Sequence, residues 1–98
     1  MFQLKMQEKI FYLLLKNSMD YIATFFTHSG AIKFNRFLLK NNISNETLPV
    51  PRQLSSNCGI GVSFSYDDNV EKFFTEDMEK LYLNEKGKFK LIKTFEWY

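Results

Sequence analysis

The stretch Ile60-Gly-Val-Ser-Phe-Ser-Tyr66 places an apolar residue at every second position, with glycine or serine between them. Successive side chains of a β-strand point to opposite faces of the sheet. The pattern therefore predicts a strand with one apolar face and one face of small polar groups. Other parts of the chain must cover the apolar face, and the segments on both sides of this strand supply candidates.

A strand and a helix are predicted upstream of it. Residues 21–26 are rich in aromatic and β-branched side chains, which favours a strand. Thr27 or Ser29 can cap a helix that follows and that ends at Asn41 and Asn42, because asparagine tolerates the backbone conformation of a helix end. The apolar residues of this helix fall on one face: Ala31, Phe34, Phe37 and Leu38.

A second helix is predicted over residues 68–86, with Asp68 as its cap, Glu71 completing a capping box and Gly87 ending it. Its apolar positions keep the helical period: Val70, Phe73, Phe74, Met78 and Leu81. A last strand then carries four apolar residues on one side, interrupted by Lys93: Phe89, Leu91, Phe95 and Trp97.

Residues 43–50 are predicted to resume an extended path between the first helix and the proline arm. The resulting order is strand, helix, strand, strand, helix, strand. We expect an α+β ferredoxin-like split βαβ sandwich, in which two helices cover one face of an antiparallel sheet. Residues 19–98 form this single domain, since 98 residues supply one core. Residues 1–18 precede it as an extension that is predicted to be helical. That extension either docks on the domain or on a partner, or lies upstream of the true start.

The composition limits the function classes. Apolar residues make up 45% of the chain and aromatic residues 17%, so a folded domain is expected. The net charge of +2 argues against nucleic acid and against acidic membranes as partners. One cysteine excludes an internal disulfide and favours a reducing, cytoplasmic setting. The longest apolar run, residues 10–15, is too short to cross a bilayer.

Neither a metal nor a cofactor is expected. One cysteine and one histidine cannot complete a zinc site, and no glycine-rich phosphate loop precedes a helix. The lysine-rich residues 86–92 match an RNA-binding strand pattern only in part. Lysines that face water on an edge strand explain this run better.

The stretch Leu48-Pro-Val-Pro-Arg-Gln-Leu-Ser-Ser-Asn-Cys-Gly-Ile60 holds both prolines and the cysteine. Pro49 and Pro51 fix an extended arm. A turn is favoured by the polar residues that follow and by the conformational freedom of the glycine; these residues are Ser55, Ser56, Asn57 and Gly59. The thiol of Cys58 is predicted to lie at the exit of this turn.

Such a turn favours a reactive thiolate. The cation of Arg52, six residues earlier, and the hydroxyl and N–H groups of the turn can stabilise negative charge on Cys58. The alternative is a cysteine that fills space as a small apolar residue. His28 either supplies a proton or an anion contact near the thiol, or is simply an exposed residue in the first turn of a helix.

The run Pro49-x-Pro51-Arg52-x-x-Ser55-Ser56-x-Cys58-Gly59 resembles the selenium/sulfur carrier protein-like family of small bacterial domains. The resemblance covers residues 21–66. It implies that Cys58 holds a persulfide or selenopersulfide, taken from a donor such as a cysteine desulfurase and passed to an acceptor. The chain would act as a carrier rather than as a stand-alone enzyme, alone or as a homodimer.

Two other functions remain open at this point. The chain can be a non-catalytic interaction or assembly module that uses the open face of the sheet and the N-terminal segment. It can also bind RNA through the sheet, in which case its affinity falls steeply with salt.

Overall fold

The computed structural model describes residues 18–54 and 56–96, so the helix predicted in residues 1–18 lies outside the described part but for Ser18. The described part contains five strands, one α-helix and one short 3₁₀ helix. In chain order these are β1 (Met19–Phe25), α2 (His28–Lys40), β2 (Asn45–Pro49), β3 (Ile60–Tyr66), η1 (Val70–Phe73), β4 (Met78–Glu85) and β5 (Lys88–Thr94).

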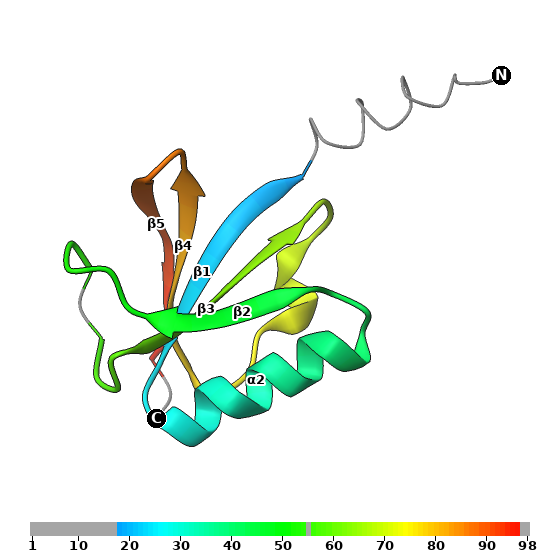
Figure 1. Ribbon diagram of the computed structural model, residues 1–98, viewed down its shortest axis with the longest axis horizontal. Coiled ribbons are helices and arrows are strands. Elements are labelled where there is room, and N and C mark those ends of the chain that lie inside the picture. The colour runs from blue at the N-terminus through cyan, green and yellow to red at the C-terminus, as the bar shows by residue number, and fades with distance from the viewer. Residues whose placement is uncertain (1–17, 55, 97–98) are drawn as a thin grey trace, which may run out of the picture.

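The strands form one sheet in the order β2-β3-β1-β4-β5, and every neighbouring pair is antiparallel. β1 and β2 therefore run in the same direction, with β3 between them and α2 as their connection. Figure 1 shows α2 lying along one face of the sheet. We call this face the helix face and the opposite one the second face.

The core lies between α2 and the helix face. Alternation along the central strands brings their apolar side chains to this face, and Phe34 of α2 packs among them. Its ring centroid lies 5.2 Å from that of Phe25 and 5.6 Å from that of Phe64. Each such buried side chain contributes about 1.5–3 kcal/mol. The fully buried members of the core include Ala23, Phe25, Ala31, Phe34, Leu38, Val62 and Leu81.

The predicted ferredoxin-like sandwich is wrong. The structure has five antiparallel strands and, among the described residues, a single α-helix. The second predicted helix is replaced by one turn of 3₁₀ helix and by β4. Asn69 rather than Asp68 caps that turn, accepting a hydrogen bond from the N–H of Glu71, and Phe74 already has an extended backbone.

Residues 70–81 were ambiguous because their apolar spacing also fits a strand that begins at Met78. Leu81 points to the helix face opposite Ala23, and Tyr82 to the second face opposite Ile22. Gly87, predicted to end a helix, instead forms the tight turn between β4 and β5. It has a φ of +89° and follows Lys86 at +55°, as a two-residue hairpin requires.

The final strand is interrupted where its apolar pattern is interrupted. Leu91 pairs with Tyr82 on the second face, whereas Lys93 pairs with Leu81 on the helix face. Ile92 is therefore the extra residue of a β-bulge, which moves all later side chains to the other face. Phe95 consequently enters the core, where its ring lies 4.8 Å from that of Phe74. The prediction that Phe89, Leu91 and Phe95 lie on one face is therefore wrong. Trp97, the fourth residue of that prediction, lies outside the described residues.

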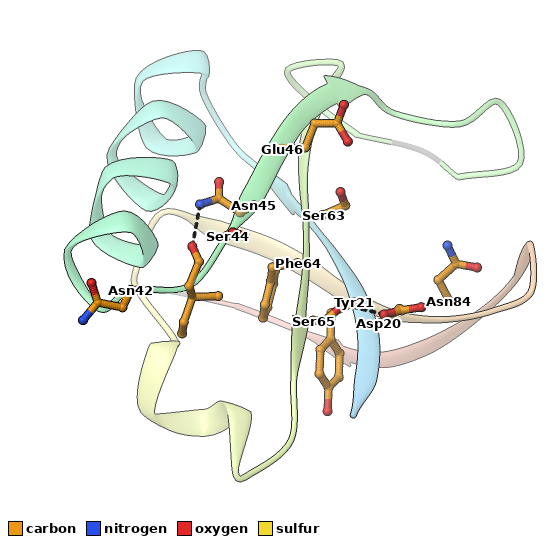
Figure 2. Close-up of a pocket in the computed structure, with 11 residues that line it drawn as sticks. Asp20, Tyr21, Asn42, Ser44, Asn45, Glu46, Ser63, Phe64, Ser65 and Asn84 are labelled. Atoms are coloured by element: carbon orange, nitrogen blue, oxygen red, sulfur yellow. Dashed lines mark hydrogen bonds between the residues drawn. The ribbon is translucent and has the colours of Figure 1, made fainter. Parts of the chain in front are cut away.

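β2 is shorter than β3, and an open pocket of about 610 Å³ lies beside the unpaired part of β3 (Figure 2). Its polar groups are in part bonded to one another. The hydroxyl of Ser65 donates to the Asp20 carboxylate, and the side-chain amide of Asn45 donates to the carbonyl of Ile43. The pocket lies towards the end of β3 that is opposite to Cys58.

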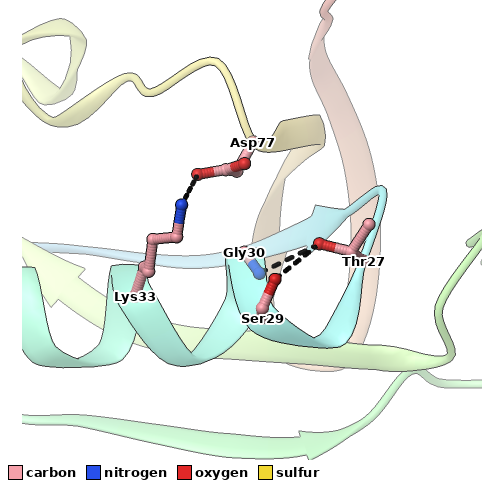
Figure 3. Close-up of polar contacts among 5 residues, drawn as sticks. All are labelled: Thr27, Ser29, Gly30, Lys33 and Asp77. Atoms are coloured by element: carbon pink, nitrogen blue, oxygen red, sulfur yellow. Dashed lines mark hydrogen bonds and ion pairs between the residues drawn. The ribbon is translucent and has the colours of Figure 1, made fainter.

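The start of α2 is fixed by two contacts, shown in Figure 3. Thr27 is the cap, and its hydroxyl accepts a hydrogen bond of 3.0 Å from the N–H of Gly30. The loop before β4 packs against the same turn, where Asp77 pairs with Lys33 at 3.7 Å. A Cβ atom on Gly30 would lie 2.7 Å from the Cβ of Asp77.

Gly30→Ala is therefore expected to lower the free energy of unfolding by about 1–3 kcal/mol, because the loop must move away from the helix. Urea denaturation measures this, with Ile32→Ala at an exposed site of the same helix as the control. In an unconstrained helix the glycine-to-alanine change stabilises. A stabilised Gly30→Ala protein would contradict the close packing of this loop.

Candidate functional site

The turn that carries Cys58 connects β2 to β3 across residues 50–59. Its two arms are joined by a hydrogen bond of 2.9 Å from the N–H of Val50 to the carbonyl of Gly59. Gly59 has a φ of +77°, a conformation that side chains disfavour. Within the turn, the N–H of Leu54 bonds to the carbonyl of Pro51 at 2.9 Å. Pro49 ends β2, and the positive φ of Gly59 is one that the conformational freedom of glycine allows.

A buried carboxylate on β4 holds the turn from one side. Glu79 is 9% exposed and accepts two hydrogen bonds from Asn57: one from its backbone N–H at 3.1 Å and one from its side-chain amide at 2.8 Å. The fully buried hydroxyl of Thr24 donates to the same carboxylate at 3.5 Å. Since β1 lies between β3 and β4, the turn reaches past β1 to make these bonds.

The negative charge of Glu79 affects the neighbouring side chain of Tyr82. Burial raises the pKa of Tyr82, and the negative charge of the Glu79 carboxylate raises it further. A carboxylate buried to this extent needs partners that replace water, since an unpaired buried charge is costly. Asn57 and Thr24 are these partners, so the carboxylate and the turn stabilise one another.

The start of α2 holds the turn from the other side. His28 is the first residue of the helix, and its Nε2 donates to the carbonyl oxygen of Cys58 at 3.2 Å. The turn therefore lies beside the N-terminal end of α2, where the helix dipole is positive and favours negative charge. His28 is exposed in the first turn of the helix, and its ring contacts the backbone of the cysteine turn rather than the thiol, so a role for it in proton transfer or anion binding stays a prediction.

The thiol of Cys58 is half-buried. Its Sγ donates to the carbonyl of Ile60 at 3.3 Å, and the side chain packs against the edge of the core. The sulfur is thus neither sealed inside the protein nor fully exposed. Because the bond to Ile60 uses the thiol proton, the thiolate form of Cys58 loses this contact.

The other predicted site residues are placed as follows. The hydroxyl of Ser56 accepts a hydrogen bond of 3.4 Å from the N–H of Gly59. Arg52 is exposed and, within the described residues, forms no hydrogen bond or ion pair. Its approach to the sulfur therefore stays a prediction. Ser55 lies outside the described residues.

Comparison with known families identifies the chain. A family model described as "Putative Se/S carrier protein-like" matches residues 20–76, more than half of the 98 residues. The chain belongs to this family. No curated protein and no solved structure matches it.

The part matched to the Se/S carrier-like family contains β1, α2, β2, the cysteine turn, β3 and η1, and it ends before β4. Both Cys58 and His28 lie inside the match, whereas Glu79 lies outside it. The sequence interpretation missed Glu79 because an acidic residue within a predicted amphipathic helix is expected to face water. Only the pairing of β4 with β1 reveals that it faces Thr24 and Asn57.

In residues 18–54 and 56–96, no helix is long and apolar enough to span a bilayer. Nor does this part of the chain bring together three histidine, cysteine, aspartate or glutamate side chains in a group that could hold a metal ion.

Glu79→Gln is expected to lower the free energy of unfolding by about 1–3 kcal/mol. Both carboxylate oxygens of Glu79 accept hydrogen bonds, and the NH₂ group of glutamine that replaces one of them is a donor and cannot accept. The same change should speed hydrogen exchange at the backbone N–H of Asn57. Urea denaturation and amide exchange by NMR measure the two effects.

Glu85→Gln, at an exposed position on the same strand, is the matched control and should leave both measurements unchanged. Equal exchange rates at Asn57 in the Glu79→Gln and Glu85→Gln proteins would show that Glu79 does not hold the turn.

Proposed function

We propose that this protein is a sulfur or selenium carrier, and that Cys58 holds the transferred atom as a persulfide or selenopersulfide. The observation that carries the proposal is the cysteine itself. It is the single cysteine in the 98 residues, and it lies half-buried in a turn that is held from both sides, in a member of the Se/S carrier-like family.

Loading is a single exchange at sulfur. The Cys58 thiolate attacks the terminal sulfur of a donor persulfide, and a new S–S bond forms at Sγ. The S–S bond of the donor breaks, and the donor leaves as a thiolate with the bonding electron pair. Unloading is the same step with an acceptor nucleophile, and the Cys58 thiolate then leaves. No external oxidant or reductant is needed in either step.

The surroundings of the turn fit a bound anion. A persulfide places its terminal sulfur one S–S bond, about 2.05 Å, beyond Sγ. The N-terminal end of α2, which reaches the turn through His28, favours negative charge there. Arg52 supplies a permanent cation a few residues away on the same turn, and its side chain can fold over the loaded sulfur.

The absence of a second cysteine from these 98 residues suits a carrier. A neighbouring thiol would attack the Cys58 persulfide, close a disulfide and release the load as hydrogen sulfide. With one thiol, the load stays until an external acceptor removes it. A dithiol oxidoreductase needs the second cysteine that this chain lacks.

After incubation with a cysteine desulfurase and L-cysteine, the intact protein is expected to gain the mass of one sulfur atom, located on Cys58 by peptide analysis. Cys58→Ser is the control and should gain nothing. A selenium donor tested in parallel decides between the two elements.

Failure of the wild-type protein to gain sulfur would contradict the proposal, provided that an alkylating reagent modifies the same sample at Cys58. That second measurement shows that the thiol is reduced and reachable. A gain of sulfur in the Cys58→Ser protein would equally contradict it, since sulfur would then bind elsewhere.

A further inference from the structure

The outward side of α2 carries a continuous ridge that no other described element covers. Four exposed residues spaced by four lie along it, and side chains at this spacing are neighbours on a helix surface; they are His28, Ile32, Arg36 and Lys40. Leu39 lies beside Arg36. Ile32 is 46% exposed and Leu39 is 54% exposed, although both are large aliphatic side chains.

The formally charged side chains of this helix all carry the same sign. Its 13 residues contain three basic side chains, Lys33, Arg36 and Lys40, and no acidic one. The chain as a whole is nearly balanced, with 13 basic and 11 acidic residues. The ridge therefore combines two exposed aliphatic residues with a local excess of positive charge.

One end of the ridge meets the cysteine turn. His28 is its first residue, and the His28 ring bonds to the carbonyl of Cys58 at 3.2 Å. The helix is about 20 Å long at 1.5 Å per residue. A protein seated along the ridge would thus have part of its surface beside the turn that carries the Cys58 thiol, to which a persulfide must be delivered.

We propose that the outer ridge of α2, together with Leu39 beside it, is the docking surface for the protein that delivers sulfur to Cys58, with Ile32, Arg36, Leu39 and Lys40 making the contacts. This inference rests on the proposed carrier function. Charge complementarity requires that the donor present acidic side chains around an apolar centre. A second copy of this chain fits the ridge less well, since symmetric pairing would bring two basic helices together.

The test uses two donors and two matched triple variants. The ridge variant is Ile32→Ser, Arg36→Glu and Leu39→Ser. The control variant is Ile92→Ser, Lys90→Glu and Leu91→Ser on β5, where Ile92 and Leu91 are 45% and 50% exposed. Each protein is loaded either by a purified cysteine desulfurase with L-cysteine or by glutathione persulfide, and the rate of sulfur gain on Cys58 is measured.

The ridge variant is expected to load about tenfold or more slowly from the desulfurase. Its rate with glutathione persulfide should equal that of the wild type, because a small donor needs no docking surface. The control variant should match the wild type with both donors. The wild-type rate with the desulfurase should also fall with added salt, and that of the ridge variant should fall less.

Each other outcome overturns the inference. Wild-type loading from glutathione persulfide but not from the desulfurase leaves the carrier function standing and removes the docking surface. Loading of the wild type by neither donor removes both. Equal desulfurase rates for the two variants place docking elsewhere. A wild-type dimer that only the ridge variant dissociates, seen by sedimentation, assigns the ridge to a second copy of the chain.

Discussion

The buried carboxylate of Glu79 ties the turn that carries Cys58 to a strand that lies two positions away in the sheet. Both hydrogen bonds from Asn57 end on it, and the buried hydroxyl of Thr24 adds a third. On the other side, the ring of His28 bonds to the cysteine carbonyl. The position of one sulfur atom thus depends on β1, β4 and α2 together. A turn held by its own residues alone would have no such dependence.

The arrangement fits two demands that the proposed carrier function makes. The sulfur must be reachable by a donor and by an acceptor, yet the loaded form must keep its cargo until an acceptor arrives. A half-buried thiol bonded to the carbonyl of Ile60 and packed at the edge of the core lies between these extremes.

The parts of the fold that depend on residues close together in the sequence were predicted correctly. The alternation in residues 60–66, the cap at Thr27 and the end of the helix at Asn41 are all present. Residues 68–86 were predicted wrongly because their apolar spacing fits a helix and a strand alike. The pairing of Leu81 with Ala23, far apart in sequence, decides between them. The bulge at Ile92 is likewise visible only from the partner strand.

The same distinction applies to the site. The turn and its thiol follow from prolines, glycine and the family pattern, all within a dozen residues. The role of Glu79 does not, because its contacts to Asn57 and Thr24 span 22 and 55 residues. The contact between His28 and the cysteine turn could not be predicted either, because His28 and Cys58 are 30 positions apart in the sequence. Local sequence patterns do not indicate which loop packs beside the first turn of a helix.

The most direct test of the central claim follows one labelled sulfur atom on Cys58 after loading with a radioactive persulfide. The label should remain on the folded protein much longer than on the same protein unfolded in urea, and should leave completely when a thiol acceptor is added. Equal rates of loss from the folded and unfolded proteins would show that the anchored turn does not hold the cargo, and would contradict the account.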